Sequence, residues 1–118
     1  LHALVLAASR RAIAAIRPGM TGVEVDAVAR DFLAQAGYGA AFGHGLGHGL
    51  GLEVHETPAC SPTCQTVIRP GMVLTVEPGI YLAGRLGIRI EDVVLITRNG
   101  CEVLSRSPHW IERPNSIH

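Results

Sequence analysis

The stretch Phe42–Glu56, FGHGLGHGLGLEVHE, has a glycine at every second position from Gly43 to Gly51 and holds three of the chain's six histidines. A dinucleotide-binding GxGxxG pattern is not met, because His48 stands where the third glycine belongs, and the chain has no lysine for a Walker-type phosphate loop. A flexible linker is also disfavoured, because leucines and histidines separate the glycines. The period of two indicates an extended segment.

In an extended segment alternate side chains share a face, and glycines on the other face let a neighbouring backbone or ligand approach closely. We therefore expect His44 and His48 to point the same way as Leu46 and Leu50, provided that the segment stays fully extended. A single buried histidine is usually a satisfied core residue. Three within twelve residues favour a shared site.

The flanking sequence predicts helices before this stretch and strands after it. Apolar residues at helical spacing predict a helix over residues 2–17 that Pro18 ends. Thr21 and Glu24 form a capping box for a second helix that Gly37 closes. β-branched runs predict strands over 72–82 and 86–97, followed by a hairpin turn at 98–100. The predicted class is α+β, with two N-terminal helices packed on an antiparallel sheet.

Two glutamates fall within the predicted strands. Glu77 ends the first one in TVEPG, and Glu91 lies in the middle of the second one in IRIED, on the same face as Arg89. A desolvated carboxylate costs several kcal/mol unless a cation or hydrogen bonds compensate. An ion pair between Glu91 and Arg89 on a solvated face explains either glutamate alone. A metal explains both glutamates together with the histidines.

Composition limits the other functional classes. The 118 residues, 47% of them hydrophobic, suit one small domain, and ten basic residues balance ten acidic ones, which disfavours binding to nucleic acid or an anionic membrane. The apolar segments are too short to span a bilayer and no signal-peptide pattern opens the chain, so we expect a cytoplasmic protein. Cys60, Cys64 and Cys101 lack paired zinc-site spacing and are expected to be reduced thiols.

Three ordered motifs, GHGLGHGLGLEVHE, LTVEPGIY and GIRIEDVVLIT, resemble the pita-bread metallopeptidases, in particular the branch of Xaa-Pro aminopeptidases and Xaa-Pro dipeptidases (prolidases). The earlier segments IRPGMTGVEVD and AGYG also resemble that family, so the resemblance covers nearly the whole chain. It implies a partial pita-bread fold and hydrolysis of the bond before a proline in the second position of a peptide.

Specific roles follow from the resemblance, residue by residue. It implies three metal ligands, the last of which bridges two ions: His48, Glu77 and Glu91. It implies three groups that contact the substrate, transfer protons or stabilise the transition state: His44, His55 and Arg89. The implied cofactor is a pair of divalent ions, manganese first, with cobalt, zinc or iron as alternatives. A hydroxide shared by the two ions would attack the scissile carbonyl.

The sequence departs from the family in one respect. The family's ligand set also includes two aspartates upstream of these motifs, and Asp26 and Asp31 do not match them, because both lie in the second predicted helix. We therefore expect residues 1–118 to be the C-terminal part of a catalytic domain, with at most one metal site and weak or no activity alone. Its uncovered sheet faces and edges favour a homodimer.

Three alternatives remain within the same fold. One is a methionine aminopeptidase-like enzyme, which EPGIY and RIED disfavour. Another is a non-catalytic pita-bread module that binds a peptide or partner, and the third is a creatinase-like hydrolase that works without metal. The retained His48, Glu77 and Glu91 favour the metallopeptidase over both.

Overall fold

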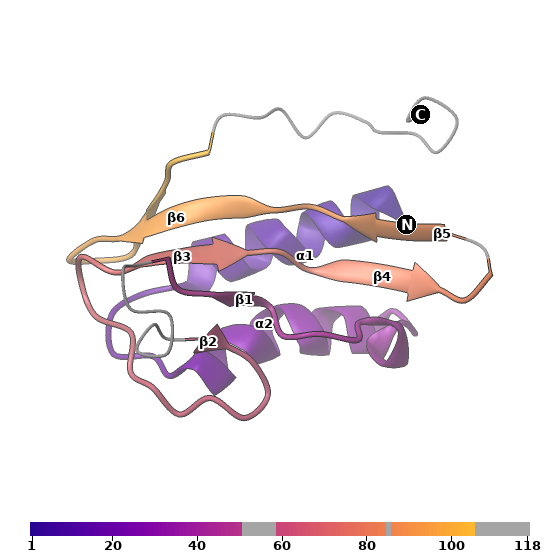
Figure 1. Ribbon diagram of the computed structural model, residues 1–118, viewed down its shortest axis with the longest axis horizontal. Coiled ribbons are helices and arrows are strands. Elements are labelled where there is room, and N and C mark those ends of the chain that lie inside the picture. The colour runs from indigo at the N-terminus through magenta and orange to yellow at the C-terminus, as the bar shows by residue number, and fades with distance from the viewer. Residues whose placement is uncertain (51–58, 85, 106–118) are drawn as a thin grey trace.

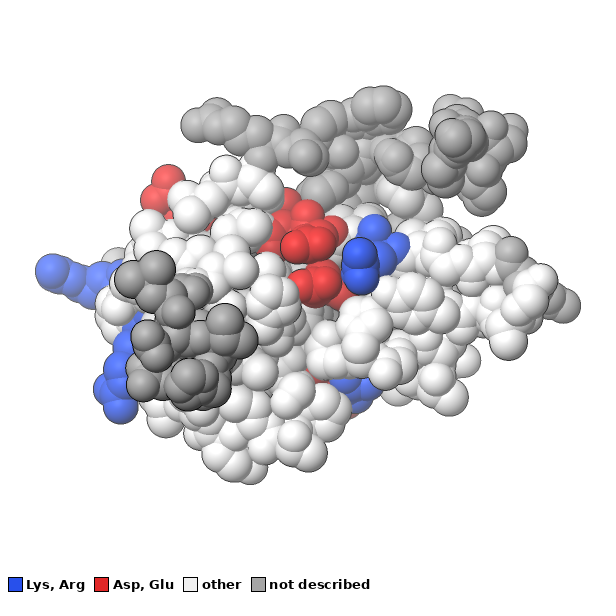
Figure 2. All heavy atoms as spheres, in the orientation of Figure 1, with Lys and Arg blue, Asp and Glu red and all other residues white. Residues whose placement is uncertain are grey.

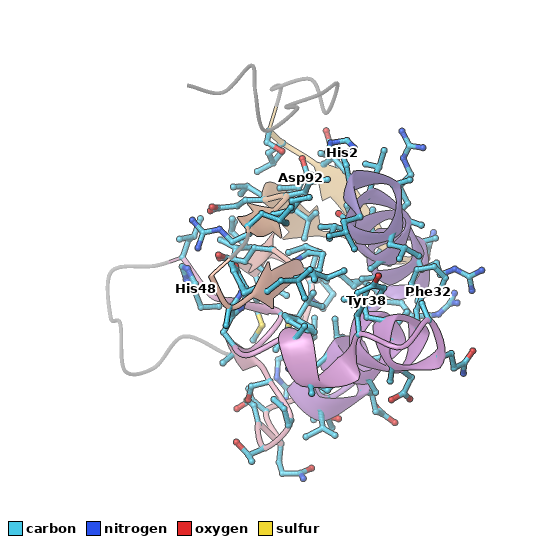
Figure 3. The ribbon with its side chains drawn as sticks, turned by 90° about the vertical axis from the view of Figure 1, so that its right-hand side faces the viewer. His2, Phe32, Tyr38, His48 and Asp92 are labelled. Carbon is cyan, nitrogen blue, oxygen red and sulfur yellow. The ribbon has the colours of Figure 1, made fainter. Side chains whose placement is uncertain are left out.

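The computed structural model describes residues 1–50, 59–84 and 86–105. Two helices and a short 3-10 turn precede the strands, and both helices lie on one side of them (Figures 1 and 3). All the named strand pairs are antiparallel, so the predicted α+β class is confirmed. In chain order the elements are α1 (His2–Ala15), α2 (Gly22–Gln35), η1 (Gly39–Ala41), β1 (Gly47–His48), β2 (Ala59–Cys60), β3 (Val73–Val76), β4 (Gly79–Leu82), β5 (Leu86–Arg89), β6 (Asp92–Ile96) and β7 (Cys101–Val103).

The first helix packs on the strands and the second helix through Val5, Ala8 and Ala12, which are fully buried. It ends at Ala15, two residues earlier than predicted. Ile16 has already left the helical region, with ψ at 129°. Pro18 disfavours helical geometry in Arg17, the residue before it, so the helix could not have continued to residue 17.

The second helix begins with the predicted capping box. Glu24 N–H donates to Thr21 Oγ1 (3.2 Å), and Thr21 N–H donates to Glu24 Oε1 (2.9 Å). Gly37 follows the last turn with φ at +94°, a conformation that glycine adopts without strain. Val25, Ala29 and Leu33 form the buried stripe of this helix.

The two long predicted strands are each divided in two. β3 pairs with β6 and β4 pairs with β5, and the register continues unchanged from one ladder to the next. The interruption falls at Glu77–Pro78, because proline has no N–H to donate, and Ile90 N–H instead donates to Pro78 O (3.2 Å). Glu91 therefore lies between β5 and β6, exposed to solvent, and its predicted place in mid-strand was wrong.

The predicted hairpin at 98–100 is confirmed. Thr97 N–H donates to Gly100 O (2.9 Å), and β7 pairs with β6 beyond the turn. In the part of the chain that the structure describes, neither helix is long and apolar enough to cross a membrane.

Candidate active site

The glycine-rich segment runs alongside β3, which places its histidines beside the TVEPG motif. An isolated bridge joins Gly49 to Leu74, and β1 pairs with β2 on its other side. Three hydrogen bonds tie the segment to β3 and its end: Leu50 N–H to Val73 O (2.9 Å), His48 N–H to Thr75 Oγ1 (2.9 Å) and Glu77 N–H to Leu46 O (2.7 Å).

The absent side chain of Gly47 makes this close approach possible. A Cβ at this position would lie 1.8 Å from the carbonyl oxygen of Thr75. The prediction that the glycines admit a neighbouring backbone is confirmed. The predicted shared face was wrong, because Leu46 is fully buried whereas the His48 side chain is 57% exposed. Within residues 42–50, which the structure describes, regular pairing covers Gly47–His48, so this part of the segment does not keep one extended period.

His48 and Glu77 face each other as two hydrogen-bond acceptors. The Nδ1 of His48 lies 3.0 Å from Gly49 O, and because a carbonyl only accepts, this nitrogen carries the proton. The other ring nitrogen, Nε2, lies 3.4 Å from Glu77 Oε2. When the ring is neutral, Nε2 carries no proton and its lone pair points toward the Glu77 carboxylate. This arrangement calls for a positive charge, either a second ring proton or a cation between the two groups.

Glu91 stands directly opposite Glu77, because the register of both ladders continues across the interruption. Like charges placed directly opposite each other on adjacent strands are destabilising. Arg89 reduces the excess of negative charge, with Nη1 at 4.0 Å from Glu77 Oε1. Figure 2 shows acidic side chains gathered against a basic one in the middle of this face. Figure 3 shows His48 on the side of the strands that faces away from the helices. Phe32 and Tyr38 lie on the opposite side, with the helices.

His44 is held by hydrogen bonds at both ring nitrogens. Nδ1 donates to Gly45 O (2.7 Å), so in the neutral ring Nε2 accepts from the hydroxyl of Tyr81 (2.7 Å). The edge of the ring also meets Phe42, with the ring centroids 5.1 Å apart. Tyr81 was missed in the sequence. The available signal was its spacing of four residues from Glu77 in EPGIY, which in an extended strand puts the two side chains on the same face.

These groups surround a hollow of about 510 Å³. Four of the six predicted site residues line it, together with Gly45 and Gly47: His44, His48, Glu77 and Arg89. Glu91 stands beside this group through its place opposite Glu77. His55 lies outside the described residues.

Comparison with known proteins identifies the family. Residues 1–98 match Peptidase_M24, metallopeptidase family M24. The chain belongs to metallopeptidase family M24. Among its relatives is the Xaa-Pro dipeptidase of Pyrococcus furiosus, 50% identical over 107 residues, which are 91% of this chain and 31% of the relative. The chain thus spans about a third of the length of the curated relatives it matches.

Solved structures of family M24 enzymes have the same fold. The prolidase from Pyrococcus horikoshii OT3 superposes with a TM-score of 0.86 at 48% identity, over 91% of this chain and 31% of that one. The X-Pro aminopeptidase from Thermotoga maritima superposes with a TM-score of 0.86 at 50% identity, over 92% and 31%. The expected pita-bread fold is confirmed.

The donor set fits the divalent metals on which family M24 depends. One imidazole and two carboxylates suit manganese, cobalt, iron or zinc, and the facing acceptors of His48 and Glu77 leave a place for a cation. The described side chains do not bring three histidine, cysteine or acidic groups together around one point. The backbone nevertheless sets the three candidate ligands side by side, with Glu91 opposite Glu77.

Two residues of the second helix contact this site and were missed in the sequence. Asp26 and Arg30 form a part-buried ion pair that reaches the backbone between Phe42 and Leu46. In the sequence, Asp26 was considered only as a metal ligand, and its position in the second helix excluded it from that role. The available signal was an acidic residue on the apolar side of an amphipathic helix, four residues before an arginine.

The thiols at Cys60, Cys64 and Cys101 are free, in agreement with the prediction. Burial, together with smaller effects of the nearby charges of Asp26 and Cys64, raises the pKa of Cys60 to about 12. Burial opposes ionisation of Cys64 as well, but hydrogen bonds with Thr66 and Ala59 outweigh it and lower that pKa. Cys60 is thus an inert, fully buried residue of β2, paired with Gly47 of β1.

Proposed function

We propose that this chain forms part of the active site of a metal-dependent peptidase that hydrolyses the bond before proline in Xaa-Pro peptides. The observation that carries the proposal is the pair of facing acceptors, His48 Nε2 and Glu77 Oε2 at 3.4 Å, on the wall of a hollow. The identity of half of the aligned residues to an Xaa-Pro dipeptidase supports the substrate class. Methionine aminopeptidase-like specificity is the alternative.

In this proposal His48, Glu77 and Glu91 hold the metal. Two divalent ions, with manganese as the first expectation, would supply Lewis-acid activation of a water nucleophile and of the scissile carbonyl. The imidazole of His48 is already oriented by its Nδ1–H bond to Gly49 O. Glu77 and Glu91 stand opposite each other, and this supports a shared role for the two carboxylates in holding the metal.

The substrate-side roles belong to His44, His55 and Arg89. His44 Nε2 accepts from the Tyr81 hydroxyl, so this pair can pass a proton at the edge of the hollow. The half-exposed Arg89 guanidinium suits a carboxylate on the substrate. His55 is proposed as a further substrate contact on the basis of its motif alone.

We further propose that residues 1–118 are the C-terminal part of a catalytic domain and that two aspartate ligands lie outside them. The 31% coverage of the relatives supports this proposal. The chain alone would then bind at most one ion and hydrolyse peptides poorly. Partly exposed Leu50, Val103 and Leu104 favour self-association as a homodimer, and light scattering that gave a clean monomer would contradict this.

The first experiment is a Mn²⁺ titration of the purified chain, followed by paramagnetic broadening of its NMR signals. We expect broadening around His48, Glu77 and Glu91, and at least a tenfold loss of affinity in His48→Ala. His2→Ala is the matched control, because it removes an imidazole on the other side of the strands (Figure 3). Equal affinity in native and His48→Ala chains would overturn the metal site.

The second experiment measures hydrolysis of an Xaa-Pro dipeptide with added manganese. We expect little turnover by the isolated chain. A substantial rate that His48→Ala abolishes would overturn the proposal that the site is incomplete, and would leave the proposed reaction class standing.

A further inference from the structure

The ion pair between Asp26 and Arg30 joins the second helix to the backbone that carries His44. We call residues 42–46 the site loop. Three hydrogen bonds connect the pair to the site loop: Arg30 Nη1 to Phe42 O (3.0 Å), Arg30 Nη2 to His44 O (2.8 Å) and Leu46 N–H to Asp26 Oδ1 (2.9 Å). Both ends and the middle of the site loop are therefore fixed to α2.

The pair is built as a rigid fork. Arg30 donates from Nε to Asp26 Oδ2 (2.7 Å) and from Nη2 to Oδ1 (3.1 Å), and Asp26 is only 1% exposed. The Arg30 guanidinium also lies over the ring of Phe42, at 4.3 Å from the centroid. Desolvation offsets much of the attraction within a buried ion pair, so such a pair adds little net stability. The geometry of the fork, which reaches two carbonyls at once, indicates a positional role.

The orientation of the His44 ring depends on this backbone. Its Nδ1–H donates to the carbonyl of the next residue, Gly45, and its Nε2 reaches Tyr81 on β4. A shift of the site loop would move the ring away from Tyr81 and release the bond that selects its tautomer. The fork fixes the carbonyl of His44 itself.

We propose that Asp26 and Arg30 are positioning residues that hold His44 in one tautomer and orientation, directed at Tyr81. The role of His44 in peptide hydrolysis rests on the proposed function. The positioning of the site loop by Asp26 and Arg30 does not rest on the proposed function, and it can be tested without metal or substrate.

The test compares Arg30→Lys with Arg11→Lys in the metal-free chain. Both arginines lie over a phenylalanine ring, at 4.3 Å for Arg30 on Phe42 and 4.4 Å for Arg11 on Phe32, and Arg30 also donates hydrogen bonds to the site loop. Lysine keeps the charge and loses the planar fork. The measurement is the ¹⁵N chemical shift of each His44 ring nitrogen, assigned by its loss in His44→Gln.

We expect the native and Arg11→Lys chains to show one His44 tautomer, with the proton on Nδ1. Arg30→Lys should give averaged nitrogen shifts, with several-fold more of the Nε2–H form. A chain that keeps the native His44 shifts in Arg30→Lys while it melts at a lower temperature would show a purely structural pair and overturn the proposal. Equal changes in both lysine variants would also overturn it.

Two further measurements cover the case in which Arg30→Lys does not fold. Asp26→Asn keeps the shape and one acceptor oxygen but removes the charge, and we expect intermediate His44 shifts. In the native chain, we expect the Leu46 N–H and the Arg30 Nε–H to exchange slowly with solvent. Fast exchange of both groups would overturn the proposal. Failure of manganese binding would contradict the proposed function and leave this result intact.

Discussion

Glu77 and Glu91 stand directly opposite each other where the two β-ladders are interrupted. The interruption has a local cause, the missing N–H of Pro78, and it lies beside His48 Nε2. Two carboxylates and an imidazole lone pair thus meet where regular pairing fails. Without a positive charge, from a second ring proton or a cation, this arrangement is unfavourable, and the chain then gives up stability at the site.

Replacement of Glu77 by glutamine tests that cost. The change removes one of two opposed charges and offers an amide N–H to the lone pair of His48. We expect the metal-free chain at pH 8 to gain about 0.5–1 kcal/mol in the free energy of unfolding, as for one net hydrogen bond, and manganese affinity to fall at least tenfold. Urea unfolding and Mn²⁺ titration measure the two effects.

Glu102→Gln is the matched control, an exposed glutamate on β7. Neither the free energy of unfolding nor the manganese affinity of the Glu102→Gln chain should differ measurably from that of the native chain. A Glu77→Gln chain that lost stability in the absence of metal would contradict the view that the two carboxylates repel each other.

Local parts of the fold could be predicted from the sequence, because they depend on residues close together in the chain. The capping box at Thr21 and Glu24 depends on neighbours three residues apart, and it formed as predicted. The direction in which the histidine side chains point could not be predicted, because it depends on how the glycine-rich segment pairs with β3. That contact depends on Gly47 and Thr75, which are 28 positions apart in the chain. Asp26 and Arg30 are only four positions apart, but their contacts with Phe42 and Leu46, 12 and 20 positions away, were missed for the same reason.

Thr75 should support His48 through its hydroxyl. Thr75 is 1% exposed, and its Oγ1 accepts the N–H of His48 and reaches its carbonyl at 3.4 Å. Thr75→Val keeps the shape and leaves a part-buried N–H without its partner, which should cost about 1–3 kcal/mol. We also expect weaker manganese binding, because the backbone that carries the imidazole loses a hydrogen bond that holds it in place.

Thr97→Val separates the two effects. The Thr97 hydroxyl also accepts a backbone N–H, that of Gly100, but in the turn before β7. We expect it to lower stability without any change in manganese affinity. Equal losses of affinity in both variants would show that the effect of Thr75 is indirect.

Gly47 should tolerate no side chain. An added Cβ would lie 1.8 Å from the Thr75 carbonyl oxygen and 2.6 Å from its carbon, so the backbone of β1 would have to leave β3. We expect Gly47→Ala to cost at least about 3 kcal/mol, in the range of severe overpacking, or to prevent folding. Circular dichroism with urea unfolding measures the loss.

Gly43→Ala is the control within the same motif. A Cβ there meets nothing within 4 Å, and the φ of Gly43 is not positive. We expect unchanged or slightly higher stability, because alanine reduces the entropy of the unfolded chain. A Gly43→Ala chain as unstable as Gly47→Ala would show that the loss does not come from the approach of β3.

The Cys60 thiol should make the chain sensitive to alkali. Burial raises its pKa from 9.0 to about 12, so above pH 9 the unfolded chain releases this proton while the folded chain retains it. The stability from this group is complete below pH 9 and is lost as the pH rises toward 12. The slope is at most about 1.4 kcal/mol per pH unit. Urea unfolding under reducing conditions at pH 8 and pH 10 measures it.

Cys60→Ala should remove this sensitivity even though it creates a small cavity. Between pH 8 and pH 10 we expect the native chain to lose about 1 kcal/mol more than Cys60→Ala does. Cys64→Ala is the control, because the pKa of Cys64 is lowered and its stability effect has the opposite sign. Equal losses in the native and Cys60→Ala chains would mean that the Cys60 thiol is not protected from solvent.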